Sequence, residues 1–230
     1  MGEDKLLSHR AVAAMLGGLA RAHLQNIPIA TVIDIGASDG HWTWDCLAAF
    51  PNARYLLIEA LEQHRAKLQK LCAKYKNIEY VIAAAGAHVG QAHLYATDDP
   101  YSGIVSTVAF RERDTIVPMT TVDTQVAQRN LAPPYLLKLD THGFELPIFD
   151  GATQTLKQTE LIIVEAYNFE MAHADKSLRF HQLCAEMEAR GFRCADLVDP
   201  MYRPKDYFLW QMDLFFRPAS TAEFQYKSYA

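Results

Sequence analysis

The feature that most constrains this chain is a short β-branched run that leads directly into small residues: residues 31–40 read Thr-Val-Ile-Asp-Ile-Gly-Ala-Ser-Asp-Gly. The first five residues have the character of a parallel strand that is buried on both faces. The next five have small side chains, so backbone N–H groups can approach a ligand before a helix begins. The spacing matches neither the G-x-G-x-x-G of nicotinamide sites nor the G-x-x-x-x-G-K-[ST] of P-loops. The stretch predicts an α/β fold with a small-molecule site at the end of this strand.

An acid closes the next predicted strand, Arg54 to Ile58, and this acid is Glu59. It follows the small-residue turn by about 20 residues, the usual separation of an acid that binds an adenosine ribose. A carboxylate suits this task because it accepts hydrogen bonds from both hydroxyls of a vicinal diol. A solvated acid at a strand end is the alternative, and the turn upstream favours ribose binding. A third strand, Ile78 to Ala83, ends in Ala84-Ala85-Gly86, where small residues would let the backbone approach an adenine ring.

Titratable side chains also follow two later strands. The strand Leu136 to Leu139 places Lys138 and Asp140 on one face, and a lysine in an apolar strand needs an acid beside it. His142 and Glu145 come next, and the strand Leu161 to Val164 ends in Glu165. Because parallel strands end at one edge of a sheet, we expect these groups to gather there. The remaining histidines, such as His64, have no comparable neighbours and are predicted to be solvated.

Two further segments are predicted outside the parallel sheet. Residues 90–121 contain three short strands separated by polar turns, which predicts a small β insertion. We expect this insertion on the substrate side, since loops at the carboxyl edge of a parallel sheet carry substrate contacts. Residues 1–28 are predicted as an N-terminal helical extension, because apolar residues recur at helical spacing over residues 5–25. Without repeats or a low-complexity linker, residues 1–230 are predicted to form a single domain.

Composition restricts the classes of partner. A net charge of −5 and a pI of about 6.0 argue against a general nucleic-acid binder, whose domain would usually be basic. No apolar run reaches the roughly 18 residues of a membrane span, and the N-terminus does not resemble a signal peptide. The four cysteines form no C-x-x-C pair, which favours reduced thiols. We therefore expect a cytoplasmic protein with a small-molecule partner, no nucleic acid and no membrane; a homo-oligomer is left open.

Several of these stretches together resemble FkbM-type S-adenosylmethionine-dependent methyltransferases. The resemblance spans roughly residues 25–215, and the Lys-x-Asp-x-x-Gly-x-Glu stretch is its most specific part. It implies a Rossmann-like, seven-stranded, mostly parallel sheet with helices on both faces, one reversed strand at the edge in an antiparallel hairpin (the class I methyltransferase fold), and a small β insertion. It also implies methyl transfer, usually to a hydroxyl of a sugar, polyketide or similar metabolite. The stretches are 32–40, Glu59, 119–123, 137–145 with Gly151-Ala152, and 162–165.

The resemblance and the residue types together suggest roles. Donor binding is assigned to Asp34, Gly36, Ser38, Asp39, Gly40, Glu59 and Ala84. Catalysis is assigned to Asp140, His142 and Glu165, and substrate binding to Lys138 and Glu145. His142 is the natural general base at neutral pH. Many relatives would have Gln or Glu at this position, so the identity of the base stays open between His142 and Glu165. His142 could instead cap the following helix.

Three alternatives remain at this level. Asp140, His142 and Glu165, together with Glu145, could bind Mg²⁺ that clamps a diol acceptor, since oxygen ligands suit such an ion. A catalytically silent domain that binds S-adenosylmethionine or another nucleotide would keep the same fold. A nucleotide-dependent oxidoreductase would use the same sheet and Glu59, but it should have a tighter glycine-rich turn and a Tyr-x-x-x-Lys proton donor, which the sequence lacks.

Overall fold

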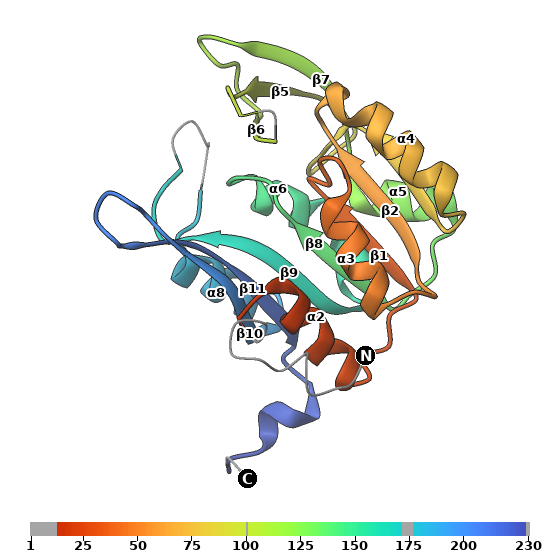
Figure 1. Ribbon diagram of the computed structural model, residues 1–230, viewed down its shortest axis with the longest axis vertical. Helices are drawn as coiled ribbons and strands as arrows, with labels where there is room; N and C mark the ends of the chain where they lie inside the picture. The colour runs from red at the N-terminus through yellow and green to blue at the C-terminus, as the bar shows by residue number, and fades with distance from the viewer. Residues whose placement is uncertain (1–12, 100, 172–176, 229–230) are drawn as a thin grey trace.

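A seven-stranded sheet forms the centre of the protein in a computed structural model, which describes residues 13–99, 101–171 and 177–228. The strand order is β10-β11-β9-β8-β1-β2-β3 (Figure 1). The five strands from β9 to β3 are parallel, and β11 is antiparallel to both of its neighbours. The strands are β1 (Thr31–Ile35), β2 (Arg54–Glu59), β3 (Ile78–Ile82), β8 (Tyr135–Leu139), β9 (Thr159–Tyr167), β10 (Phe192–Tyr202) and β11 (Leu209–Pro218).

The predicted sheet is confirmed except for the place of its reversed strand. We expected this strand at the edge, but β11 lies one position inside it, between β9 and β10. The burial of the two strands explains the order. Leu214, Phe215 and Phe216 of β11 are buried on both faces, whereas most side chains of β10 are exposed. The strand with two apolar faces therefore takes the inner position, and the more polar strand forms the edge.

Helices cover both faces of the main sheet (Figure 1). Alternate residues of the central strands point to opposite faces: Val32 belongs to one core cluster, and Ile33 belongs to the other. The helices are α2 (Met15–Leu24), α3 (His41–Ala49) and α4 (Arg65–Lys74) beside the first cluster, and α5 (Val122–Arg129), α6 (Glu145–Asp150), α7 (Thr153–Leu156) and α8 (Phe180–Ala189) beside the second. Two short 3₁₀ turns, η2 (Glu62–His64) and η3 (Ala222–Gln225), complete the helical elements described.

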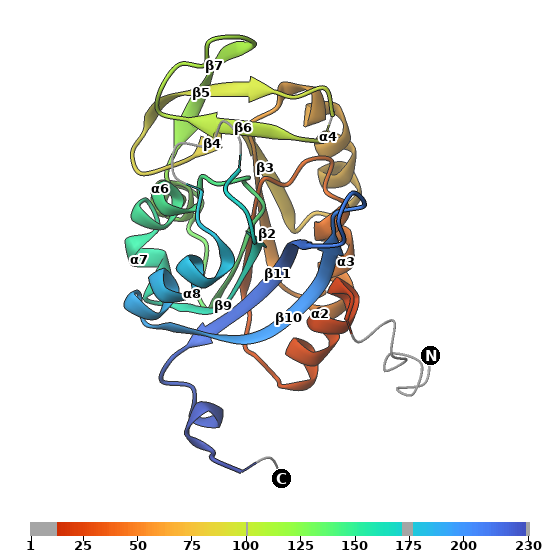
Figure 2. The same ribbon diagram turned by 90° about the vertical axis from the view of Figure 1, so that its left-hand side faces the viewer.

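The predicted insertion forms a second sheet with the order β4-β7-β5-β6. It begins at Ala84, earlier than the expected boundary at residue 90, because β4 pairs in parallel with β7. Figure 2 shows this sheet lying across one end of the main sheet, near β3 and α4. Its strands are β4 (Ala84–Ala85), β5 (Gly90–Ala96), β6 (Gly103–Ser106) and β7 (Asp114–Thr120).

The predicted N-terminal helix is described only in part, as α2, because residues 1–12 lie outside the described residues. The backbone N–H of Met15 donates to the Asp199 carboxylate at 2.9 Å, and Arg21 forms an ion pair with Asp196 at 2.7 Å. Both acids lie in β10, so α2 is fixed against the edge of the sheet. Within the described parts of the chain, the helices are too short or too polar to span a lipid bilayer.

Asp123, one of the residues that carried the resemblance, has a structural task. Its carboxylate accepts hydrogen bonds from the backbone N–H groups of Gln154 and Thr155, at 2.9 and 2.8 Å, and so caps α7. Thr121, two residues earlier, caps α5 by accepting from the N–H of Thr124. Burial alone would raise the pKa of Asp123, but these hydrogen bonds outweigh it and lower the pKa below 3.8.

We expect Asp123→Ala to lower the free energy of unfolding by about 1–2 kcal/mol, the usual effect of a lost cap. Because the pKa is lower in the folded protein than in the unfolded chain, the stabilisation is present above about pH 4 and is lost as the pH falls below it. Urea unfolding of both proteins at pH 7 and pH 3 measures this. Asp150→Ala, at an exposed ion pair, is the control; an Asp123→Ala effect no larger than the control would contradict the capping role.

Candidate functional site

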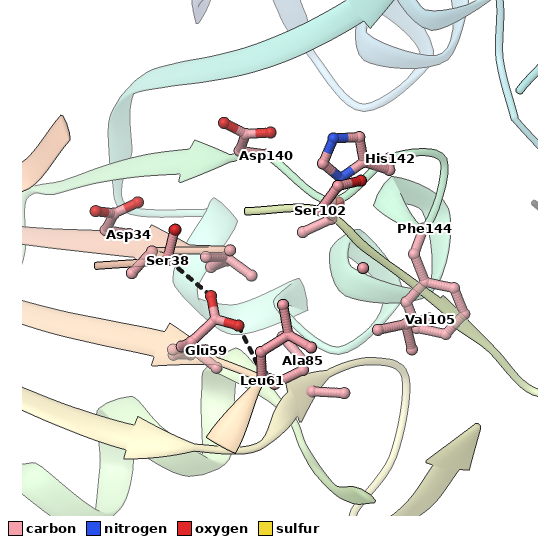
Figure 3. A pocket seen from close by; sticks show the side chains of 18 of the residues that line it. Asp34, Ser38, Glu59, Leu61, Ala85, Ser102, Val105, Asp140, His142 and Phe144 are labelled. Carbon is pink, nitrogen blue, oxygen red and sulfur yellow. Dashed lines mark hydrogen bonds between the residues drawn. The ribbon is translucent and has the colours of Figure 1, made fainter. Parts of the chain in front are cut away.

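A cavity of about 250 Å³ opens where the main sheet meets the insertion. It lies at the carboxyl ends of β1, β2 and β8, the edge at which parallel α/β sheets bind ligands. Figure 3 shows side chains from these strand ends facing side chains of the insertion across the cavity. Nine predicted site residues line the cavity: five come from the first two strands and the segments after them and after β3, and four come from the later strand ends. They are Asp34, Gly36, Ser38, Glu59 and Ala84, then Lys138, Asp140, His142 and Glu165.

The turn after β1 can approach the neighbouring strand only because its first residue is glycine. Gly36 has a φ of +77°, and a Cβ atom there would lie 2.0 Å from the backbone oxygen of Asp140. The N–H of Gly36 donates to the backbone oxygen of Ile58 at 2.9 Å, so the turn is also tied to β2. The glycine therefore brings the carboxyl ends of β1, β2 and β8 to one place.

Glu59 is held firmly at the middle of the cavity. Its carboxylate accepts hydrogen bonds from the backbone N–H groups of Ser38 and Leu61, both at 2.7 Å (Figure 3). Burial raises the pKa of Glu59, and these N–H donors oppose the rise. Since a carboxylate offers about four acceptor positions, Glu59 retains the capacity to accept from a ligand hydroxyl.

One end of the cavity is apolar. Figure 3 places Leu61, Ala85, Val105 and Phe144 around it. These four side chains come from four separate segments: the residues after β2, then β4, β6 and the loop after β8. Small and flat surfaces that face each other in this way suit a planar apolar ring.

The opposite end is charged and centres on Lys138, whose side chain is almost fully buried. Its ammonium donates to Asp140 at 3.1 Å and lies 4.0 Å from Asp213 of β11. Burial would lower the pKa of Lys138, but the carboxylates around it outweigh this effect and raise the pKa. Burial likewise would raise the pKa of Asp140, but the charge of Lys138 lowers it to about 2. Lys138 and Asp140 therefore form an ion pair in which the lysine is buried and the acid is half-buried, and this pairing was predicted from the sequence.

The pKa values of two other acids near this lysine shift in the opposite direction. Asp34 is buried in β1 and accepts a hydrogen bond from the Thr43 hydroxyl at 2.6 Å. Burial raises the pKa of Asp34 to about 6, although Lys138 and Thr43 partly oppose the rise. The pKa of Asp213 is also raised to about 6 by burial. One ammonium group therefore lies among more carboxyls than it can neutralise.

His142 and Glu165 approach each other at the rim of this charged end. His142 has a φ of +53°, and its Nε2 lies 3.8 Å from the Glu165 carboxylate. Glu165 also accepts hydrogen bonds from the Tyr167 hydroxyl and from the Gln211 amide. Burial and the nearby charge of Asp140 raise the pKa of Glu165 well above its ordinary value. The pair therefore offers two groups that can accept a proton beside the cavity.

The same residues were considered for Mg²⁺, and possible ligand atoms of Asp140, His142 and Glu165 do lie within 4.8 Å of one another. Their existing partners argue against a cation. Lys138 already donates to Asp140, and both oxygens of Glu165 accept hydrogen bonds. A divalent ion would have to displace these donors and lie close to a buried ammonium group. The residues therefore do not fit the alternative of a Mg²⁺ site, and we assign the metal no role.

Three predicted site residues lie outside the lining. Asp39 turns to Lys67 and His41, at 2.9 and 3.1 Å, and Gly40 begins α3 with a φ of +86°. Glu145 is buried, and its carboxylate accepts from the N–H of Gly143 and the hydroxyl of Thr141, at 2.9 and 3.1 Å. It fixes the loop that carries His142 rather than facing the cavity.

Several lining residues were not predicted, and some of them belong to the insertion. Asp99, Tyr101, Ser102 and Val105 line the cavity, as does Trp42 of α3. Only the loop composition of residues 98–103 indicated a contact there, and it did not indicate which one. His64 was predicted to be solvated, but it is buried with 3% of its surface exposed. Its partners come from distant segments, which no local pattern reveals.

Comparisons with known proteins give one family and a shared fold. A family model described as the methyltransferase FkbM domain matches residues 34–194. A proposed O-methyltransferase from Klebsiella pneumoniae has a TM-score of 0.52 at 14% identity, over 89% of this chain and 80% of its own. An uncharacterised protein from Listeria monocytogenes serotype 4b has a TM-score of 0.50 at 8% identity, over 88% and 67%. These two likenesses show a shared fold. No curated protein matches the chain at a significant level of sequence similarity.

We expect Lys138→Met to leave Asp34, Asp140 and Asp213 without their cation, so that their pKa values rise in the folded protein. Groups with a higher pKa in the folded than in the unfolded state bind protons on folding, so stability falls as the pH rises above about 4. The loss of unfolding free energy should reach about 3–5 kcal/mol at pH 8 and be clearly smaller at pH 5.

Urea unfolding of both proteins at the two pH values measures this difference. Lys157→Met, at an exposed lysine, is the control and should be neutral at both. An equal loss for Lys138→Met at pH 5 and pH 8 would contradict the electrostatic account.

Proposed function

The chain belongs to the FkbM methyltransferase family, and from this premise we propose that it transfers a methyl group from S-adenosylmethionine to a hydroxyl oxygen of a small molecule. The single observation that carries the proposal is the order in which different surfaces follow one another along one cavity. An apolar end lies beside Leu61 and Phe144, Glu59 lies in the middle, and His142 with Glu165 lies at the charged end.

These surfaces suit the parts of the donor in order. The apolar end would hold the adenine ring, and Glu59 would accept hydrogen bonds from the ribose diol. The small residues Gly36 and Ala37 leave room for the methionine part. The sulfonium carries a positive charge, which the carboxylates of Asp34 and Asp140 would favour at the other end. In this role Asp140 acts through its charge, while Lys138 keeps it ionised.

The reaction we propose is a direct displacement. The acceptor oxygen attacks the methyl carbon, and the carbon–sulfur bond breaks with its electron pair left on sulfur. The hydroxyl proton passes to the imidazole of His142. Glu165, 3.8 Å away, stabilises the imidazolium that forms, because the new positive charge favours the ionised form of this acid. The protein contributes mainly by holding the two reactants in line, which is where most of such an acceleration originates.

The acceptor would enter at the place where β9 ends and β11 begins. The ring of Tyr167 lies 6.3 Å from that of His142, and Trp210 packs edge-on against Tyr167 at 6.0 Å. Aromatic rings next to hydrogen-bonding acids suit an acceptor with both apolar surface and hydroxyl groups. A sugar or a hydroxylated secondary metabolite, the class that the family resemblance implies, has both.

Binding of the donor is tested by titration calorimetry with S-adenosylhomocysteine. We expect the wild type to bind at micromolar concentration, and Glu59→Ala to bind at least tenfold more weakly because two ribose hydroxyls lose their acceptor. Glu62→Ala, an exposed acid three residues away, is the control and should bind like the wild type. The proposal fails if the folded wild type does not bind.

The base is tested with methyl-tritiated S-adenosylmethionine and a panel of hydroxylated sugars and polyketide lactones. With an accepted substrate, His142→Ala should lower kcat by about 10²–10⁴-fold, the usual contribution of a general base. Glu165→Gln should lower it less, since it removes only the partner of the imidazolium. The reverse ranking would assign the base to Glu165, and calorimetry should show that both variants still bind S-adenosylhomocysteine.

A further inference from the structure

The insertion was expected to select the acceptor, but its side chains lie at the part of the cavity we assign to the donor. Val105 faces Leu61 and Ala85 at the apolar end (Figure 3). Gly103 lies so close to Leu61 that a Cβ atom there would meet a Leu61 methyl group at 3.4 Å. The second sheet therefore closes the side of the cavity opposite the main sheet.

Tyr101 connects this insertion to the residues around Glu59. It lines the cavity, and its ring stacks on the buried ring of His64 with 6.1 Å between centroids and 26° between planes. The ammonium of Lys67 lies 5.2 Å from the centre of the tyrosine ring. The Tyr101 side chain is 53% exposed, but its stack on His64 and its contact with the Lys67 ammonium both restrict the movement of the ring.

The partners of Tyr101 are themselves tied to the small-residue turn. The Nε2 atom of His64 lies 3.5 Å from the Ser38 hydroxyl, and the Ser38 N–H donates to Glu59. Lys67 donates to Asp39 of the same turn at 2.9 Å. Two independent connections therefore run from Tyr101 to the turn that borders the assigned ribose site. This arrangement also gives Asp39 a place in the site, although its carboxylate does not line the cavity.

We propose that Tyr101 is a positioning residue that retains the donor, and that the demethylated product leaves only after Tyr101 separates from His64. This inference rests on the proposed function, because it concerns how the same cavity holds S-adenosylmethionine and releases S-adenosylhomocysteine. The insertion then controls the lifetime of the donor complex, and acceptor selection is left to the β9–β11 end.

The test is the dissociation rate of S-adenosylhomocysteine from the full chain, measured by stopped-flow competition. Tyr101→Ala should raise this rate at least tenfold and weaken binding in calorimetry to a similar extent. Tyr101→Leu should behave in the same way, because leucine fills the space without a planar ring. Tyr101→Phe should stay within about twofold of the wild type, because it keeps the ring that stacks on His64 and faces the Lys67 ammonium, and it loses only the hydroxyl contact with Lys67. Tyr226→Ala, at an exposed tyrosine of the C-terminal segment, is the matched control.

Each outcome decides between the two proposals. If the wild type binds S-adenosylhomocysteine and the Ala and Leu variants release it at the wild-type rate, the role of Tyr101 is wrong and the proposed function stands. If the wild type does not bind, the proposed function itself fails. Thermal unfolding of each variant is measured alongside, because a merely structural role would lower Tm without separating the Phe variant from the Leu variant in dissociation rate.

Discussion

The ammonium group of Lys138 lies buried where three strands present acids to one another. Asp34 belongs to β1, Asp140 follows β8, and Asp213 belongs to β11, so the interaction joins the parallel core to the reversed strand. A charged group in such a place is costly unless it is paired, and here the pairing also keeps Asp140 ionised. The close approach of the turn at Gly36 to the backbone of Asp140 completes this junction. The positions of Asp34, Asp140 and Asp213 in the charged end of the cavity depend on it.

The two ends of the cavity follow from different parts of the fold. The charged end is built from strand ends of the main sheet, from the loop that Glu145 fixes, and from α3, whose Thr43 donates to Asp34. The apolar end needs the insertion, because Val105 supplies a surface that the main sheet lacks. A donor with a flat apolar ring at one end and a positive sulfur at the other matches this division. The proposed chemistry and the proposed retention of the donor are therefore separable: the first is assigned to the main sheet and the second to the added sheet.

Local patterns predicted most of the main sheet, because buried parallel strands and the acids that end them leave a continuous signal in the sequence. Glu59, Lys138, Asp140, His142 and Glu165 were placed correctly at one sheet edge for this reason. The position of β11 was not predicted correctly, because the order in which strands pair depends on the burial of whole strands. Asp39 and Glu145 were assigned to ligands because sequence gives a position but not the direction of a side chain. The burial of His64 and its stack on Tyr101 join segments about 37 residues apart, and such tertiary contacts leave no local pattern.

The most direct measurement of the central claim is a crystal structure of the protein with S-adenosylhomocysteine. The account predicts the adenine ring between Leu61, Val105 and Phe144, both ribose hydroxyls within hydrogen-bond distance of the Glu59 carboxylate, and the sulfur atom facing the His142 end. A ligand bound elsewhere, or one bound in the cavity with its ribose away from Glu59, would contradict it.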